Sequence, residues 1–184
     1  HAEAEMYKKM LVPLDGSTLA EVLESYSCFL VANQKMEVKI LHVLPPGERS
    51  TLPMAEAYVD SAVQKIKLAD EQKGVKVTGE VAIERSAADA IKKHAKKDNV
   101  DFVLMATHGR SGIARFVLGS VAEAVLRESK TPVWLIRSGI SEKRIKNSFP
   151  LKQILLLLDG TSKAEEAVPY VQQLVKQFGN NATE

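Results

Sequence analysis

Short apolar runs alternate with longer amphipathic segments along most of the chain. The runs end at proline, glycine or charged residues, as strands do where they enter turns, and lie within residues 8–17, 37–46, 75–84, 100–109 and 132–137. Between them, apolar residues recur at helical spacing, for example Leu19, Val22, Leu23, Tyr26 and Leu30. Strands alternating with helices form βαβ units, so the pattern predicts an α/β fold: an open, doubly wound, mostly parallel five-stranded sheet, Rossmann-like, with the expected order 3-2-1-4-5.

The end of the chain repeats its beginning. Residues 8–31 align without gaps on residues 152–175. The identical positions are Lys8, Leu11, Leu14, Asp15, Gly16, Ala20, Glu21, Tyr26, Leu30 and Val31, which recur as Lys152, Leu155, Leu158, Asp159, Gly160, Ala164, Glu165, Tyr170, Leu174 and Val175. A capping-box spacing also occurs twice, as Thr18-x-x-Glu21 and Ser162-x-x-Glu165, so both copies are expected to continue from a strand into a helix.

This repeat predicts the domain organisation. We expect one complete domain over residues 6–138, a polar and basic linker over 139–150, and the first βα unit of a second, incomplete repeat over 151–184. A lone βα unit cannot bury its apolar face. It therefore needs partners from the first domain, from another chain or from sequence that is missing here.

Composition narrows the classes of function. A net charge of +2 and 5% aromatic residues supply neither the basic field nor the stacking residues of a nucleic-acid binder, so no nucleic-acid partner is expected. The longest apolar run, ILLLL, is too short to cross a membrane. The single cysteine, Cys28, excludes an internal disulfide and is expected to be a small buried hydrophobe. The single cysteine also favours a reducing cytoplasm as the location, and the opening HAEAE has no signal-peptide form.

The stretch ATHGRSGIARFVLGS, residues 106–120, follows an apolar run and carries candidate phosphate chemistry. Gly109 and Gly112 allow backbone amides to approach an anion closely, and Gly119-Ser120 begins a helix whose free amides favour negative charge. Arg110 adds charge from the loop. The alternative is purely structural: Ser120-x-x-Glu123 is also a capping box, and Gly119 serves the turn alone.

Other polar residues are interpreted against the same strand-end crevice. Asp15 follows the first strand, where its carboxylate accepts from an adenine amino group or a ribose hydroxyl, or forms an Asx turn. His42 is expected to be a core histidine, and His108 to fix the loop or contact a ligand. His94 stands among lysines and is predicted on a solvated helix face. No spacing of histidines, cysteines or carboxylates predicts a metal cage.

These residues resemble the universal stress protein family. Its ATP-binding members carry Gly, two residues, Gly, nine residues, Gly and then Ser or Thr, and here Gly109 is followed by RSGIARFVL and Gly119-Ser120. SVAEAVLRESKTPVWLIR continues as in the family, and LVPLDGS and ILHVLPP are similar to its first two strands. Ala106 departs from the motif by replacing the first glycine. The resemblance covers residues 6–138, and 151 to 178 as the beginning of another domain.

The resemblance implies an ATP site with a magnesium or manganese ion supplied by solvent. It places adenine and ribose near Pro13, Asp15 and the Val43 backbone. The phosphates and the loop around them would involve Ala106, His108, Gly109, Arg110, Gly112, Gly119, Ser120 and Val121. The second copy has Leu157 in place of the proline and no glycine loop, so it cannot form a complete site alone.

Three functions are weighed. The first is an ATP-binding regulatory or stress-response module with slow or no hydrolysis, and the second is a nucleotide-free dimeric interaction module. The third is a weak ATPase, since Asp15, His108 and the arginines are the only candidates for catalysis. The family also implies a homodimer through the edge of the fifth strand, Pro132 to Arg137, which is apolar and needs a partner.

Overall fold

The computed structural model describes residues 7–17, 20–71, 74–107, 118–137, 140–147 and 151–179. Its centre is a five-stranded sheet in the order β3-β2-β1-β4-β5, and every neighbouring pair is parallel. The strands are β1 (Lys9–Pro13), β2 (Glu37–Leu44), β3 (Val77–Ile83), β4 (Phe102–Ala106) and β5 (Val133–Ile136). The predicted fold class and strand order are confirmed.

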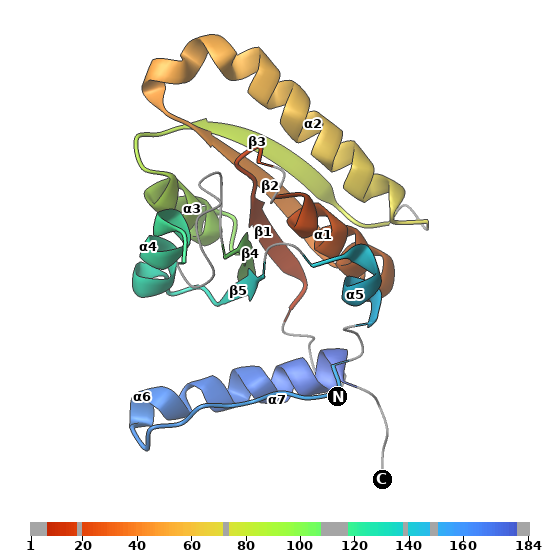
Figure 1. Cartoon of the computed structure of the whole chain (residues 1–184), viewed down its shortest axis with the longest axis vertical. Coiled ribbons are helices and arrows are strands. Elements are labelled where there is room, and N and C mark those ends of the chain that lie inside the picture. The colour runs from red at the N-terminus through yellow and green to blue at the C-terminus, as the bar shows by residue number, and fades with distance from the viewer. Residues whose placement is uncertain are drawn as a thin grey trace.

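Helices cover both faces of the sheet (Figure 1). One face packs against α1 (Glu21–Gln34), α2 (Leu52–Leu68) and α5 (Glu142–Asn147). The opposite face packs against α3 (Ala87–Lys97) and α4 (Ser120–Glu128). A 3-10 helix, η2 (Pro46–Thr51), connects β2 to α2. Because helices cover both faces, the sheet's central strand is buried throughout its interior, which is why its sequence is a continuous apolar run.

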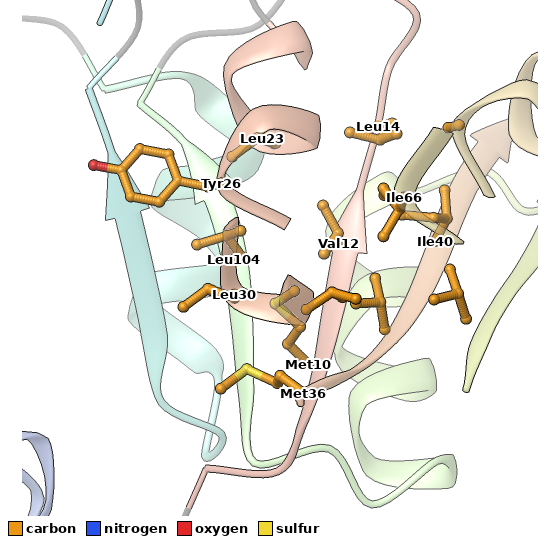
Figure 2. Packing of buried hydrophobic residues seen from close by; sticks show 14 of the residues in the cluster. Met10, Val12, Leu14, Leu23, Tyr26, Leu30, Met36, Ile40, Ile66 and Leu104 are labelled. Carbon is orange, nitrogen blue, oxygen red and sulfur yellow. The ribbon is translucent and has the colours of Figure 1, made fainter. Parts of the chain in front are cut away.

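Alternate residues of β1 enter two separate cores. Met10 and Val12 join the larger cluster between the sheet and α1 and α2, which Figure 2 shows in part. Leu11 points to the other face and joins the cluster beneath α3 and α4. Side chains alternate along a strand, so this division follows directly from the pleat.

The N-caps of three helices differ from those predicted from the sequence. Gly119 is the N-cap of α4, and Ser120 is its first residue with no side-chain capping bond, so the capping-box role weighed for Ser120 is wrong. In the second copy, the cap is Thr161, whose Oγ1 accepts from the Ala164 amide at 3.2 Å, and not Ser162. The N-cap of α1 is Ala20, while Thr18 lies outside the described residues.

The sequence analysis did not predict two short elements. η2 begins at the second proline of the Pro-Pro pair, and α5 forms within the expected linker, where Ile145 is buried in the larger core. The helix between the second and third strands, α2, begins at Leu52 and ends at Leu68. Cys28 is half-buried on α1, so the expected full burial is wrong.

The two described histidines differ in how well they were predicted. His42 is a core histidine, as expected: it is buried, and its Nδ1 lies 2.7 Å from the Leu14 carbonyl oxygen. His94 was expected on a solvated face, but it is only 4% exposed. Its position three residues after Ile91 places it on the buried side of α3, while the neighbouring lysines reach solvent with their long stems.

The C-terminal unit, residues 151–179, lies against the amino end of the sheet (Figure 1). Its helix is present as α6 (Ser162–Glu165) and α7 (Ala167–Phe178). The expected strand is not formed: Leu151 makes a single parallel bridge with Gly179, and residues 152–159 have no strand assignment. A strand needs neighbours for its backbone hydrogen bonds, and this segment has none within the described sheet.

Aromatic packing anchors this unit to β5 and to Tyr7, which precedes β1. Phe178 is buried against Trp134 and Tyr7, with ring centroids 5.3 and 6.3 Å apart, respectively. The side-chain amide of Gln177 makes two hydrogen bonds to the Tyr7 backbone. Its Nε2 donates to the Tyr7 carbonyl at 2.7 Å, and its Oε1 accepts from the Tyr7 amide at 3.2 Å. Over the ranges that the structure describes, no helix is both long and apolar enough to cross a membrane.

Candidate functional site

A cavity of about 400 Å³ opens at the carboxyl ends of β1, β2 and β4. Ligands of open parallel sheets bind at this edge, where the order of the strands reverses, and in this sheet the reversal lies between β1 and β4. Its walls come from α1, α3, α4 and η2. The location of the cavity therefore follows from the topology, and its shape follows from the helices that cross above it.

The inner surface of the cavity is mainly apolar. Leu14, Leu41 and Met105 are buried residues from three adjacent strand ends. Ala87 and Ile91 of α3 line it too. An apolar slot of this kind accommodates a flat ring system, while the polar groups fix its orientation.

The structure brings together seven of the residues that the sequence placed in the site. Pro13, Asp15, Val43, Ala106, Gly119, Ser120 and Val121 all line the cavity. The other four predicted residues, His108, Gly109, Arg110 and Gly112, lie outside the described residues. The grouping of the seven reflects the parallel sheet, which places the carboxyl ends of β1, β2 and β4 at one edge.

The end of β1 is fixed by local hydrogen bonds. Asp15 Oδ1 accepts from the Ser17 amide at 3.0 Å and from the Ser17 hydroxyl at 2.6 Å, which is the Asx turn weighed for this residue. Gly16 follows with a φ of 78°, a left-handed conformation that glycine adopts without strain. Leu14 returns to the sheet by donating its amide to Leu41 at 2.9 Å. The turn therefore holds the Asp15 carboxylate at the cavity.

The amino end of α4 forms another wall. Gly119 donates its amide to the Thr107 carbonyl at 2.8 Å, and Thr107 donates its own amide to Ile136 at 2.9 Å. These bonds attach the helix start to the ends of β4 and β5. The first-turn amides of a helix have no partner within the helix and carry partial positive charge. Residues Gly119 to Ala122 line the cavity, so this end of α4 provides a surface suited to an anion.

Several residues that line the cavity were not predicted from the sequence. Glu48 reaches the cavity from η2, and Ala87 and Ile91 reach it from α3. The Pro-Pro-Gly turn after β2 was the available signal for Glu48, because it stops the strand at the ligand-binding edge. No local pattern marks Ala87 or Ile91, since their position depends on how α3 crosses the sheet.

An all-parallel sheet with this strand order and a cavity at the carboxyl ends defines a doubly wound α/β protein. Residues 6–137 match the model of the Universal stress protein family, and the chain belongs to that family. It is 30% identical over 142 residues to Universal stress protein MJ0531 of Methanocaldococcus jannaschii, covering 72% of this chain and 83% of that protein. A universal stress protein of Methanothermobacter thermautotrophicus is 31% identical over 147 residues, covering 73% and 98%, respectively.

Solved structures agree with this assignment. The M. jannaschii protein MJ0577 superposes with a TM-score of 0.62 at 28% identity, over 74% of this chain and 99% of that chain. A universal stress protein from Archaeoglobus fulgidus superposes with a TM-score of 0.69 at 25% identity. This match covers 92% of the present chain and 63% of the other, so it extends beyond residues 6–137.

Proposed function

We propose that the cavity binds an adenine nucleotide, with ATP as the principal ligand, and that the protein is a nucleotide-dependent regulatory module. The observation that carries this proposal is the meeting of an apolar slot, the Asp15 carboxylate and the amino end of α4 at one strand-end cavity. The slot suits a purine ring, the carboxylate suits ribose hydroxyls or the adenine amino group, and the helix end suits phosphates.

Two structures with the same fold contain adenine nucleotides. A universal stress protein in complex with cAMP superposes with a TM-score of 0.57, and the A. fulgidus protein in complex with dAMP superposes with a TM-score of 0.55. At 24% and 20% identity these likenesses establish the fold alone. The choice of ligand therefore rests on the cavity of the present chain.

A divalent ion is part of the proposal. The polar side chains among the described lining residues are Asp15, Glu48 and Ser120, so the cavity presents two carboxyl groups to a polyanion. A magnesium or manganese ion bound with the triphosphate offsets that repulsion, and carboxylate oxygens are ligands that both ions accept. Removing the ion with a chelator is therefore expected to weaken binding of ATP more than binding of AMP.

Hydrolysis is proposed to be slow or absent. Fast phosphoryl transfer uses a fixed lysine or arginine beside the phosphates and an oriented nucleophile. The described part of the lining contributes no cationic side chain. A regulatory role, in which nucleotide occupancy changes the surface around the cavity, fits this composition better than catalysis.

The proposal is tested by isothermal titration of the protein with ATP and magnesium. Gly119→Val places a branched side chain at the cavity wall beside the first-turn amides, so it is expected to abolish or strongly weaken binding. Gly74→Val is the matched control, because nothing lies within 4 Å of the position of a new Cβ there. Absence of heat with the native protein would refute the proposal and favour a nucleotide-free interaction module.

The proposed assembly is a homodimer through the edge of β5, residues Pro132 to Arg137. β5 pairs only with β4 in the described sheet, and its four residues are all half-buried and apolar. An apolar edge strand favours association with another chain. Light scattering at micromolar concentration is expected to give the mass of two chains, and the mass of one chain would contradict the assembly.

We also propose the domain boundaries 6–138 and 151–184, with residues 139–150 as the connection. The aromatic anchor between Trp134 and Phe178 supports a C-terminal unit that is added to an already complete sheet.

A further inference from the structure

Four charged or titratable side chains meet on the face of β2 and β3 that α3 covers, near the end of that helix. Lys39 comes from β2, Glu80 from β3, and His94 and Asp98 from the last turn of α3 and its C-cap. Lys39 Nζ lies 2.6 Å from Glu80 Oε2 and 2.5 Å from Asp98 Oδ2. The ammonium group therefore bridges the two carboxylates and offsets part of their negative charge.

His94 is the unexplained member of this cluster. Its side chain is 5% exposed, and its Nδ1 is buried with no hydrogen-bond partner. That atom faces both acids, 3.6 Å from Glu80 Oε2 and 3.8 Å from Asp98 Oδ2. Because no hydrogen bond occupies Nδ1, this ring nitrogen is available as a ligand to a metal ion.

The separations of the three ligand atoms fit a small divalent cation. Ligands about 2.0–2.2 Å from a tetrahedral zinc ion lie roughly 3.3–3.6 Å from one another. The two distances from His94 Nδ1 are close to this range, and all three atoms lie within 4.8 Å of one another. One nitrogen and two carboxylate oxygens form a donor set that zinc accepts, with an open position for water.

We propose that Glu80, His94 and Asp98 bind a divalent transition metal ion of the zinc class, which displaces the Lys39 ammonium. Lys39 is the competitor built into the site, since it contacts both acids. Its flexible stem allows the ammonium to leave. Lys97 and Lys9 add positive charge nearby, and Lys9 Nζ donates to the Asp98 carbonyl at 2.7 Å. These cations keep the affinity below that of a site made only of acids and histidines.

Binding would connect this site to the cavity through one helix. The same α3 that ends at His94 and Asp98 begins at Ala87, which lines the cavity with Ile91. A metal bridge from β3 to the end of α3 therefore restrains one wall of the proposed nucleotide site. The metal site itself does not depend on the nucleotide proposal.

The first test is titration of the metal-free full chain with zinc chloride. The native chain is expected to bind one zinc ion, and His94→Gln is expected to weaken the binding by about tenfold or more, since it removes the nitrogen ligand. Lys92→Met is the control, because Lys92 pairs with Asp89 and Glu128 outside the cluster, and it is expected to bind zinc as the native chain does. Equal affinity of His94→Gln and the native chain would overturn the proposal.

A second variant keeps the test decisive if His94→Gln does not fold. Lys39→Met removes the competing ammonium and leaves two carboxylates unpaired, so it is expected to melt at a lower temperature without metal and to gain more than the native chain from zinc chloride. Lys92→Met is the matched control here too, because it also leaves two carboxylates without their lysine, those of Asp89 and Glu128, but outside the cluster. If zinc raises the melting temperature of Lys39→Met no more than that of the native chain, the site does not exist.

Discussion

Asp15 combines two roles in one side chain. Its Oδ1 forms the Asx turn with Ser17, and the same residue lines the cavity. A carboxylate that is held by its own turn loses little further conformational freedom when it accepts a hydrogen bond from a ligand. The local structure therefore prepares the proposed contact with the nucleotide before any ligand arrives.

Asp15→Asn separates these roles, since asparagine also forms Asx turns but has no charge. We expect stability to change little and the affinity for ATP to fall about tenfold, in line with the loss of one charge-assisted hydrogen bond. Titration calorimetry and thermal melting measure the two effects. A large drop in melting temperature with unchanged affinity would assign Asp15 to the turn alone.

Gly79 is required by close packing between β3 and α2. A Cβ at this position would lie 2.3 Å from Val59 Cγ1 and 2.9 Å from Val63 Cγ2. Gly79→Ala is therefore expected to lower the free energy of unfolding by about 1–3 kcal/mol. The cost should be smaller when Val59→Ala is present, which a double-mutant cycle measured by urea unfolding would show. Gly47→Ala is the control, with nothing within 4 Å, and an equal cost there would contradict the packing argument.

At the scale of elements, the connection from α2 to β3 depends on one carboxylate. Asp70 Oδ2 accepts from the Val75 amide at 2.6 Å, and Oδ1 pairs with Lys35 Nζ at 3.1 Å. Lys35 is itself the C-cap of α1, with a φ of 53°. Asp70 therefore joins the end of α1 to the turn that precedes β3. The Val75 amide, together with Lys35, lowers the pKa of Asp70 below its ordinary value of 3.8.

This pKa shift gives a pH dependence with a definite sign. Because the folded pKa is lowered, the stabilisation by Asp70 is present above the unfolded pKa of 3.8 and is lost as the pH falls through the folded pKa. Asp70→Asn is expected to be less stable than the native chain at neutral pH, and the difference should shrink as the pH falls toward about 3. Urea unfolding across this range measures it, and a difference independent of pH would contradict the assignment.

The elements show which features local sequence determines. The five strands were predictable because their apolar runs end at Pro13, Pro45 or similar stops, and a parallel sheet buries such runs on both faces. The strand-end position of Asp15 and Gly119 followed from the same pattern. The burial of His94 and the contribution of Ile91 to the cavity depend on the packing of α3 against the sheet. The lysines around His94 led to the prediction of a solvated face, so this packing was not predicted.

For the whole molecule, the attachment of the C-terminal unit depends on one aromatic cluster. Trp134, the only tryptophan of the chain, is stacked on Phe102 with ring centroids 4.1 Å apart, and Phe178 packs on it from α7. The rest of the unit leaves large apolar side chains exposed. Leu155 is 83% exposed, whereas its counterpart in the first copy, Leu11, is fully buried.

Phe178→Ala tests this attachment directly. Replacing a buried phenylalanine typically costs about 3–5 kcal/mol, so the unit is expected to separate from the sheet. Trp134 fluorescence should then shift to longer wavelength as the ring gains contact with water. Val175→Ala on the same helix is the control, because Val175 is 52% exposed. An unchanged emission spectrum in Phe178→Ala would show that other contacts hold the unit.

The unpaired segment 152–159 has a consequence for amide exchange with solvent. Residues 9–13 and their counterparts in the second copy have similar sequences, but only the first set forms a strand between two neighbours. The amide hydrogens of β1 should exchange only when the whole domain unfolds, whereas those of residues 152–159 should exchange at nearly the rate of an unstructured peptide. The amides of α7 should be intermediate, because a helix forms its hydrogen bonds within itself and needs no neighbouring strand.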